Sequence, residues 1–546
     1  MARLSPRAAE LVRALQERRS FGAKLFGRRL DPSTLRELEA LGEVLVAPLL
    51  LPFVFDSERE TAERVAGVIR ALVAGRAPSA ALELEEASRS VYGYAGIDHS
   101  DWFSMTAKDV GRAAALHDPA ALVGVATFHS SGYVRHAAVL ALDAMPGYLG
   151  IPYLLVRLND WVTPVADAAK RAILRRTGDW ASTWVECLPL VTRLGYATRR
   201  EHVEVIDAVF STLKRRKNRA VLEAGFASQD RATRRVCYRL AREVSTEDAL
   251  ASVVMRALQS DDQTVRLAAM RDAASRLVGD PLGRVLAQAE RDAFAPVRRV
   301  ALEVGVERFP ESAIDRVRRA LLDGSAPVRE LARYLATKHV PSLDVAALYR
   351  EQLTAPVDVA VAVTSLAGIA ETGGQEDAAR VSSLLTHPRA AIRAQAIRAL
   401  GKLDPETYAS VFVASLSDAS PRVAHAARSV LEQHPAFLDY ATISALVRHG
   451  AYPHSRADAL RLGSTLGKWA SLVFWLEASQ TGEPALVETA RERIVQWLAR
   501  ANFRYTAPRA SEISSLQALL GRSEGSLSAT TVTHIRGFLH PWSGTP

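Results

Sequence analysis

The sequence predicts an all-α protein: a right-handed α-solenoid, or superhelix, of stacked helical hairpins with atypical helical caps at both ends. A short motif recurs about every 31–33 residues, and the apolar residues within each copy follow helical spacing. The composition of 48% apolar, 24% charged and 7% aromatic residues suits packed helices. We expect a helical cap over residues 1–105, a repeat array over 106–440, and divergent repeats with a second cap over 441–546.

Residues 1–105 lack the repeated motif. Asp31, followed by Pro32, Ser33 and Thr34, predicts a capped helix start. The apolar run 44–55 predicts a buried helix bent by its two prolines, and the mixed aromatic and polar stretch 91–102 predicts a loop that ends the cap.

The repeated motif is a loop with an aspartate, often a proline, then a branched residue and an arginine, then small and aliphatic residues. The branched residues stand at positions 134, 165, 265, 297, 328, 359, 392 and 423. Two further copies, around Thr198 and Thr233, fill the gap between 165 and 265. Within each copy the apolar positions follow i, i+3, i+4 and i+7, which form one helix face. Proline at the start suits a first helical turn, and Ser420 before Pro421 is a candidate N-cap.

A second amphipathic stretch precedes each of these helices. Examples are residues 282–290, 313–322 and 378–385. Two helices of 10–14 residues with their turns fill one period. Because a single hairpin cannot bury its own apolar face, neighbouring hairpins must stack.

The period and the Asp-x-x-x-Pro-Val-Arg string resemble HEAT repeats, closest to the class called PBS-lyase HEAT-like repeats, over residues 120–440 and towards 500. In that family, aspartates of the inter-helix turns and arginines of the second helices form a ladder between repeats. The resemblance assigns this structural ladder to Arg135, Arg266, Asp292, Arg298, Asp323, Arg329 and Arg393. Val165-Ala166 and Val423-Ala424 lack the arginine, so the ladder is expected to be interrupted there.

The C-terminal part departs from the period. Trp469, Trp475 and Trp497 are expected in long helical segments, followed by a last helical pair that ends near Leu539. Terminal units of a solenoid cover the open end of its core and are therefore atypical.

The sequence contains no established catalytic motif, and we expect no enzyme, cofactor or metal site. Gly463 to Lys468 is one residue short of a phosphate-binding loop and is better explained as a helix junction. The thirteen histidines lack ligand spacing. The stretch Asp98 to Asp101 holds acid–base residue types but is expected to be an ordinary loop. Cys187 and Cys237 lie near arginines that could lower a thiol pKa, yet packing in the core is the favoured interpretation.

The two cysteines indicate a reducing compartment, and the longest apolar run has only 12 residues. A membrane span needs about 20. We therefore expect no membrane partner and a location in the cytoplasm.

The net charge of +9 is localised. Residues 170–243 hold 17 Lys or Arg against 8 Asp or Glu, so the rest of the chain sums to zero. If the cations of this segment align along the groove of the solenoid, they form a basic stripe. The candidate binding residues for a polyanion or an acidic partner are Arg199, Arg200, Lys214, Arg215, Arg216, Lys217, Arg219, Arg234 and Arg235.

Three functions remain open on these grounds. The leading hypothesis is a non-catalytic scaffold whose concave face binds a protein partner, acidic in character, around the basic segment. The second is a nucleic-acid-binding module that uses the same cations, with strongly salt-dependent affinity. The third is a HEAT-like enzyme such as a DNA glycosylase, although no catalytic aspartate in a groove can be assigned.

Overall fold

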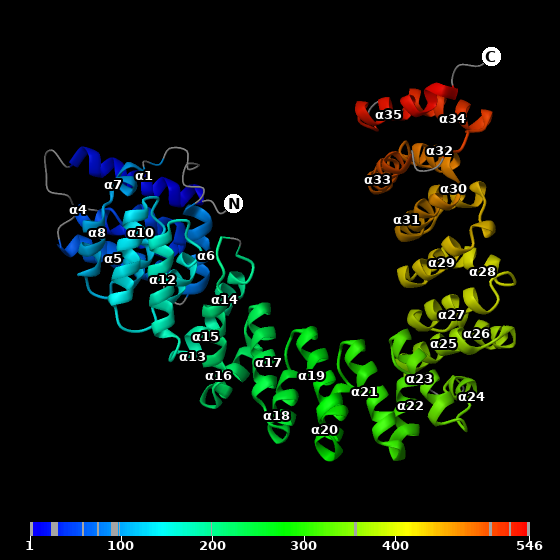
Figure 1. Ribbon diagram of the computed structural model, residues 1–546. Helices are drawn as coiled ribbons and strands as arrows, with labels where there is room; N and C mark the ends of the chain where they lie inside the picture. Colours follow the sequence, from blue (N-terminus) through cyan, green and yellow to red (C-terminus); the bar gives the residue numbers. More distant parts are fainter. Residues whose placement is uncertain are drawn as a thin grey trace. The chain divides into compact units, whose positions relative to one another are not determined.

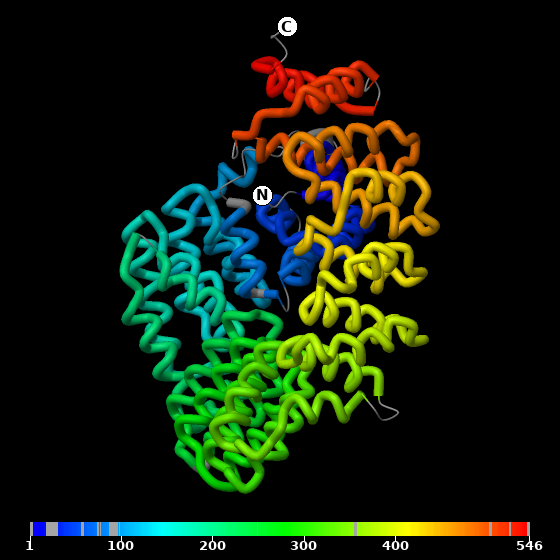
Figure 2. Tube along the Cα trace, turned by 90° about the vertical axis from the view of Figure 1, so that its right-hand side faces the viewer, coloured from blue at the N-terminus to red at the C-terminus, as the bar shows by residue number. Residues whose placement is uncertain are grey.

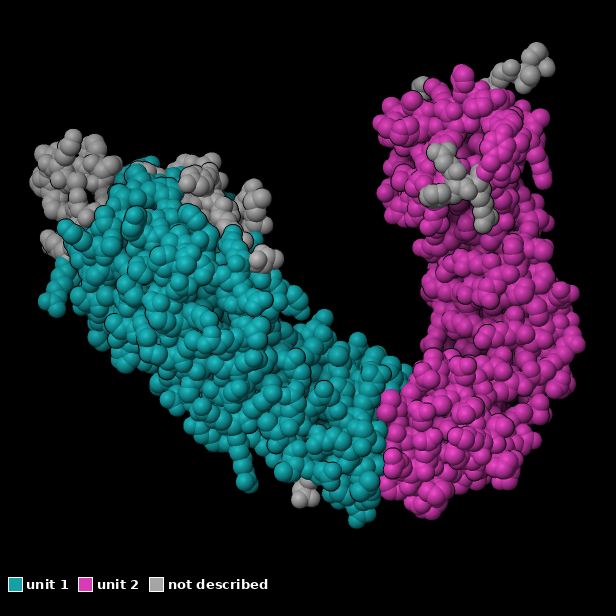
Figure 3. All heavy atoms as spheres, viewed as in Figure 1, with its two compact units in different colours: residues 1–297 teal, residues 298–546 magenta. Residues whose placement is uncertain are grey.

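The computed structural model describes residues 4–22, 31–56, 59–73, 76–88, 97, 99–197, 199–353, 358–501, 505–522 and 526–542. These residues form α-helices and short 3-10 helices joined by turns, with no β-sheet among them. They divide into two compact units, residues 1–297 and 298–546, which Figure 3 colours separately. The predicted all-α solenoid of stacked helical hairpins is confirmed.

The N-terminal helices of the first unit do not follow the repeat. They are α1 (Pro6–Gly22), α2 (Pro32–Leu41), η1 (Val44–Val46), α3 (Ala47–Leu50), α4 (Phe53–Asp56), α5 (Arg59–Val73), α6 (Ala77–Ser88), α7 (Ser100–Ser104) and α8 (Ala107–Ala114). Asp31 caps α2 by accepting the amide of Ser33 at 3.0 Å. The run 44–55 is buried as predicted, but it forms three short helices rather than one bent helix, because Pro52 lies in a turn between α3 and α4. Of the predicted loop 91–102, residues 91–96 and 98 lie outside the described residues.

The repeats of the first unit are hairpins whose second helices pack side by side. Their helices are α9 (Ala120–Ala126), α10 (Gly132–Ala144), α11 (Ile151–Arg157), α12 (Thr163–Arg176), α13 (Ala181–Glu186), α14 (Leu188–Leu194), α15 (Val203–Leu213), α16 (Arg219–Ala224), α17 (Arg231–Val244), α18 (Glu247–Ala257), α19 (Gln263–Arg276) and α20 (Gly279–Ala289). Helices α10, α12 and α15 contact one another in order, as do α17 and α19 (Figure 1). Each of these contacts buries a stripe of small and aliphatic residues, such as Val165, Ala169, Ala172 and Ile173 of α12.

Helix α21 (Ala295–Arg308) runs across the division between the units, and the second unit continues the same pattern (Figure 2). Its helices are α22 (Ala313–Leu321), α23 (Ala326–His339), α24 (Val345–Glu351), α25 (Val359–Thr372), α26 (Ala378–Ser382), α27 (Ala390–Leu403), α28 (Ala409–Ser415), α29 (Pro421–Gln433), α30 (Tyr440–His449), α31 (Pro453–Leu462), α32 (Lys468–Ala478), α33 (Pro484–Arg500), α34 (Ala510–Gly521) and α35 (Ala529–Leu539). Short 3-10 turns accompany them: η5 (Pro310–Ser312), η6 (Gln375–Asp377), η7 (Ser383–Thr386), η8 (Pro435–Phe437), η9 (Gly463–Thr465) and η11 (His540–Trp542).

The three expected first helices are present as α20, as η5 with α22, and as α26 with η7. The glycine-spaced run at 463–468 is a helix junction, with Gly467 at a positive φ of 89° before α32. Ser420 stands at the N-cap position of α29 but makes no side-chain cap; its amide donates to Asp418 instead, at 2.8 Å. Asp418, and not the Ser420 side chain, therefore provides the side-chain hydrogen bond at this helix start.

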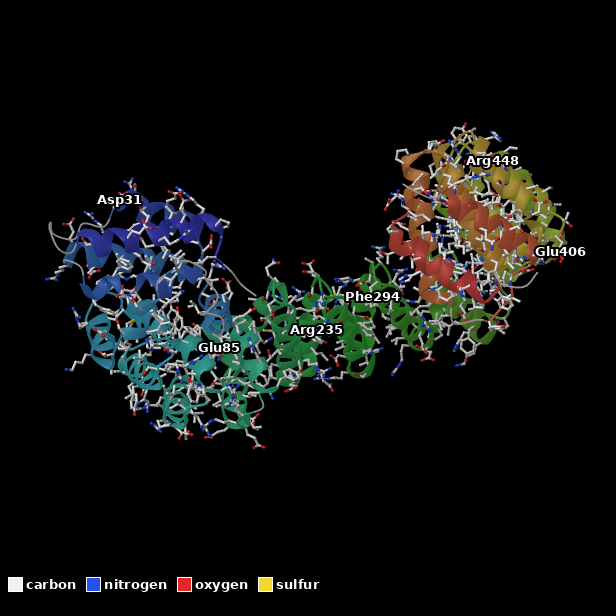
Figure 4. All side chains as sticks on the ribbon, turned by 90° about the horizontal axis from the view of Figure 1, so that it is seen from above. Asp31, Glu85, Arg235, Phe294, Glu406 and Arg448 are labelled. Carbon is white, nitrogen blue, oxygen red and sulfur yellow. The ribbon has the colours of Figure 1, made fainter. Side chains whose placement is uncertain are left out.

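One N-terminal helix packs against the repeats. Helix α6 contacts α11 and α14, although it precedes them by more than 60 residues. Glu85 of α6 forms an ion pair with Arg157 at the end of α11. In Figure 4 this glutamate lies among the blue-to-cyan helices of the first repeats, and Arg235 lies in the green helices that follow.

Candidate functional site

Most arginines of the motif reach an aspartate in the turn of the next hairpin. The Arg Nε donates to the Asp, and in most repeats a terminal nitrogen also donates to the carbonyl six residues before the arginine. The pairs are Arg135–Asp160 at 2.8 Å and Arg266–Asp292 at 2.9 Å in the first unit, and Arg298–Asp323 at 2.7 Å and Arg393–Asp418 at 2.8 Å in the second. Arg329 pairs instead with Glu371 of α25, at 3.1 Å from its Nε. We call this series of pairs the ladder.

The ladder aspartates also hold the turns. Asp160 accepts the amide of Val162 at 2.9 Å, and Asp292 accepts the amide of Phe294 at 2.7 Å. Each carboxylate thus satisfies an otherwise free amide at a helix start and a guanidinium from the preceding repeat. Sequence reasoning did not name Asp160, although the separation from its arginine, 25 residues, recurs in the pairs of Arg298 and Arg393. This separation, 25 or 26 residues in the four arginine–aspartate pairs, was the available signal.

Three carboxylates that pair with arginines of the repeats have lowered pKa values. Burial alone would raise the pKa of Asp160, but its hydrogen bonds from Arg135 and Val162 and the charge of Arg157 outweigh burial and hold that pKa below its ordinary value. The pKa of Asp262 is lowered in the same way, with Arg235 and Thr264 outweighing burial. The pKa of Asp418 is lowered by Arg393 and Ser420 against the same opposing effect.

We expect the contribution of these aspartates to the unfolding free energy to be constant near neutral pH and to fall in acid. An unfolded aspartate titrates near about 3.9. Because the folded pKa values lie lower, the ladder stabilises the fold above that pH, and this stabilisation is lost as pH falls through the folded pKa values. Urea unfolding from pH 7 to pH 3 measures the effect, and Asp160→Asn should show a smaller acid-dependent loss than the unaltered chain. A stability that stays level down to pH 3 in the unaltered chain contradicts this assignment.

The ladder changes form at the two places where an interruption was expected. On α12 the polarity reverses: Asp167 of the helix pairs with Arg200 of the next turn at 3.2 Å. On α29 a histidine replaces the arginine, and His425 contacts the fully buried Asp458 of α31. At both places the arginine of the motif is absent, as expected, but another pair of polar side chains still links the two repeats.

In α17 two neighbouring arginines, Arg234 and Arg235, make the two kinds of bond that a single ladder arginine makes in the other repeats. Arg234 donates to the carbonyl of Ser228 at 2.5 Å, which is the intra-repeat bond made by the other ladder arginines. Arg235 pairs with Asp262 at 2.8 Å. Both were named as candidate binding residues, and both guanidiniums already hold neighbouring turns.

The candidate cations do not form one stripe, because they lie on opposite edges of the helix layer. The ladder edge consists of the turns before the second helices, residues 128–132, 159–163, 199–202, 228–230 and 260–262, and it carries Arg199 and Arg200. The opposite edge consists of the turns after these helices; there Arg215 donates to the carbonyl of Gly178. Helix α15, with 11 residues, separates the two groups by about 16 Å. The alignment assumed from the sequence is thus not found in the first unit.

Several of these cations are also neutralised locally. Lys214 pairs with Glu243 and Arg219 with Glu223, each at 2.7 Å. The exposed cations Arg215, Arg216 and Lys217 have no carboxylate partner among the described residues.

The ladder edge of the first repeats holds the most unusual surface. Tyr133, Trp161 and Tyr196 are 87%, 70% and 86% exposed, in or beside three consecutive turns. The guanidinium of Arg135 lies 5.3 Å from the centre of the Trp161 ring. Beside Trp161 is a hollow of about 310 Å³ that reaches the buried Arg157. None of these aromatic residues was assigned a binding role from the sequence. The available signal was the presence of large aromatic residues at motif turns, where small polar residues are usual.

The buried histidine at this hollow is neutral. His129 accepts the amide of Ser131 on Nδ1 at 3.0 Å and contacts the carbonyl of Trp102 through Nε2 at 2.6 Å, so Nε2 carries the proton. Burial and the charge of Arg135 lower its pKa.

The other candidate chemical groups are placed as follows. Cys187 and Cys237 are both buried; burial raises the pKa of Cys187, and it raises the pKa of Cys237 to about 12, so neither thiol is activated by its arginine neighbours. In the part of the chain that the structure describes, no three His, Cys, Asp or Glu residues come together as metal ligands. Asp98 lies outside that part.

No single helix among the described residues has the length and hydropathy of a membrane span; Arg59–Val73 and Pro78–Glu86 meet those limits only as a pair bent by 102°.

These features define a class: an α-solenoid of HEAT-like hairpins with an arginine–carboxylate ladder. Comparison with known protein families finds no match, and no curated protein matches. Among solved structures, importin beta is 14% identical with a TM-score of 0.39, covering 98% of this chain and 83% of that one. Kap95p bound to RanGDP is 12% identical with a TM-score of 0.33, covering 92% and 70%, and Kap121p bound to Nup53p is 10% identical with a TM-score of 0.30, covering 96% and 65%.

Proposed function

We propose that this chain is a non-catalytic scaffold of the short, PBS-lyase HEAT-like class that binds a protein partner through the ladder edge of its first repeats. The observation that carries the proposal is the row of exposed aromatic residues, Tyr133, Trp161 and Tyr196, next to the arginines of this edge. Aromatic and arginine side chains are the residues enriched at the energetic centres of protein interfaces.

The ladder makes this edge a rigid platform. Arg135 and Asp160 fix the turn that carries Trp161, and a Cβ on Gly132 would lie 3.0 Å from Val162, so the turns at 132 and 162 are in close contact. Aromatic side chains presented by an ordered turn lose little conformational entropy on binding, which favours affinity.

Photo-crosslinking tests this function. A benzoylphenylalanine introduced at Tyr133 should capture one discrete protein partner, whereas the same group at Tyr334, which is 60% exposed in the second unit, should not capture it. With the purified partner, calorimetry should show a loss of about thirtyfold for Trp161→Ala, the loss expected at the centre of an interface. A partner that cross-links equally from both positions, or that binds Trp161→Ala unchanged, contradicts the proposal.

A second candidate function, nucleic-acid binding, is favoured by one observation on the opposite edge. Arg215, Arg216 and Lys217 are consecutive and exposed. Fluorescence anisotropy of labelled oligonucleotides at low salt tests it, with Arg215→Glu, Arg216→Glu and Lys217→Glu combined. Binding that falls steeply with salt and disappears in this variant, but persists in Trp161→Ala, would favour this function over the protein scaffold.

A further inference from the structure

Two hollows lie side by side on the ladder edge and share one wall. The first, of about 260 Å³, is lined mainly by aliphatic side chains, among them Leu82, Leu190 and Leu194. The second, of about 310 Å³, is the polar hollow beside Trp161. Glu85 and Asn159 line both hollows, so the two are neighbouring compartments of one site. Helix α6 supplies Leu82 and Glu85, so this site exists only because α6 packs against α11 and α14.

The charge of the site is moderately positive. Four arginines line the two hollows, against the two carboxylates Glu85 and Asp160. Arg135 and Arg157 are neutralised by those carboxylates. The positive charge that remains belongs to Arg193, on the aliphatic hollow, and Arg199, on the polar one.

These two arginines are exposed. Among the described residues, Arg199 donates only one long bond, 3.3 Å to the carbonyl of Asn159. Arg193 has no ion pair or hydrogen bond with any residue that the structure describes. A carboxylate that approached either guanidinium would form a charge-assisted hydrogen bond without breaking an existing ion pair.

Two buried polar atoms beside the hollows are unsatisfied. The Asn159 Oδ1, on the shared wall, and the Arg157 Nε, at the polar hollow, have no hydrogen-bond partner among the described residues. The Arg157 side chain is more than nine-tenths buried, and its guanidinium lies 5.1 Å from the centre of the Phe128 ring. Both atoms lie beneath the accessible surface. Because a buried polar atom without a partner is unfavourable, a shift of the wall that exposed either atom to a ligand's N–H or C=O group would lower the free energy.

We propose that the two hollows bind a short acidic peptide segment of the partner protein. An aliphatic side chain occupies the leucine-lined hollow, a carboxylate a few residues away pairs with Arg199 beside Trp161, and the peptide backbone passes the Asn159 carboxamide. This inference rests on the proposed function, since it names the chemistry of the partner that the ladder edge receives.

The charge balance favours a peptide over a nucleic acid. Arg135 and Arg157 are already paired with Glu85 and Asp160, so only Arg193 and Arg199 keep an uncompensated positive charge, which is too little for a run of phosphates. A single carboxylate needs only Arg199. The apolar hollow also has no role in phosphate binding, whereas it suits one aliphatic anchor.

Peptide display on the full-length chain tests the proposal. Selected peptides should combine an aliphatic residue with Asp or Glu a few positions away. Fluorescence polarisation of one selected peptide should show a loss of about tenfold or more for Arg199→Ala, the loss expected when a charge-assisted bond is removed. The same peptide with its acid changed to the amide should lose as much.

Two further variants test whether the aliphatic hollow itself, and not the overall charge of the chain, contributes to peptide binding. Ala197→Trp fills the aliphatic hollow without changing its charge and should weaken the peptide by about tenfold or more. Arg216→Ala removes an exposed cation from the opposite edge and should leave the affinity unchanged. Circular dichroism melting checks that each variant is folded.

Each outcome has a defined meaning. Selection of basic peptides, of none at all, or of peptides whose affinity ignores both Arg199→Ala and Ala197→Trp overturns the inference. Displacement of the peptide by tripolyphosphate at equal concentration overturns it too, in favour of a simple anion site. If a partner cross-links from position 133 but no acidic peptide binds, the proposed function stands and only the peptide inference is overturned. If an acidic peptide binds but no partner cross-links, the two hollows are a peptide site and the proposed scaffold function is overturned.

Discussion

Replacing Asp160 by alanine should destabilise the first repeats by about 3–5 kcal/mol, the effect expected when one member of a buried ion cluster is removed. The Asp160 side chain is fully buried and accepts from Arg135 at 2.8 Å and 2.9 Å, from Arg157 at 2.9 Å and from the amide of Val162. Its loss leaves the buried Arg135 without a carboxylate and the start of α12 without its acceptor. Hydrogen exchange of the amides of residues 130–176 measures the local free energy of opening.

The matched control is Asp167→Ala, seven residues further along the chain, in α12. Its side chain is half exposed, and its pair with Arg200 is solvated. An exposed ion pair contributes only about 0–1 kcal/mol. If the two variants lose similar stability, the ladder is not the structural element inferred from its burial.

The second large effect is expected for Gly368→Ala in α25. A Cβ at this position would lie 2.6 Å from the Cδ1 of Tyr349, and closer still to two other atoms of that ring. Tyr349 is fully buried and donates its hydroxyl to the carbonyl of Leu321 at 2.9 Å, so the ring cannot turn aside without losing that bond. Overpacking of this kind destabilises by about 1–3 kcal/mol or more. Urea unfolding followed by circular dichroism measures it.

Two comparisons identify the clash as the cause. Gly537→Ala, on the exposed face of α35 with nothing within 4 Å of the new methyl group, should be neutral or slightly stabilising because alanine is the better helix former. In a Tyr349→Leu background, Gly368→Ala should lose much less stability than in the unaltered chain, since the ring is gone. Equal losses in both backgrounds would show that the glycine is needed for another reason.

Much of the fold could be predicted because it follows from local chemistry repeated along the chain. The spacing of Val297, Ala301 and the equivalent residues defines one buried helix face, and a proline at the start of α29 marks its first turn. The step of the repeat then requires stacking, because one hairpin leaves its apolar face uncovered. Predictions that needed only these local patterns, such as the cap of Asp31 on α2, hold in the structure.

The structure departs from local patterns where tertiary contacts or an intervening helix decide the placement of a residue. Ser420 has the residue type of an N-cap, but the ladder aspartate Asp418, already held by Arg393, takes the amide of Ser420. The cations at 199–200 and at 214–217 are close in sequence, yet an intact helix, α15, places them at opposite edges of the layer. Counting charges along the chain could not detect this separation.

The sequence by itself determined the helical class, the repeat and the identity of most ladder arginines, because each depends on residues within one period of the chain. Only the tertiary structure decided which surface is available for binding. The packing of α6 on α11 and α14 brings Glu85 to Arg157 across 72 residues and creates the two hollows beside Trp161. Such a contact depends on side-chain packing between distant segments, and no periodic pattern along the chain records it.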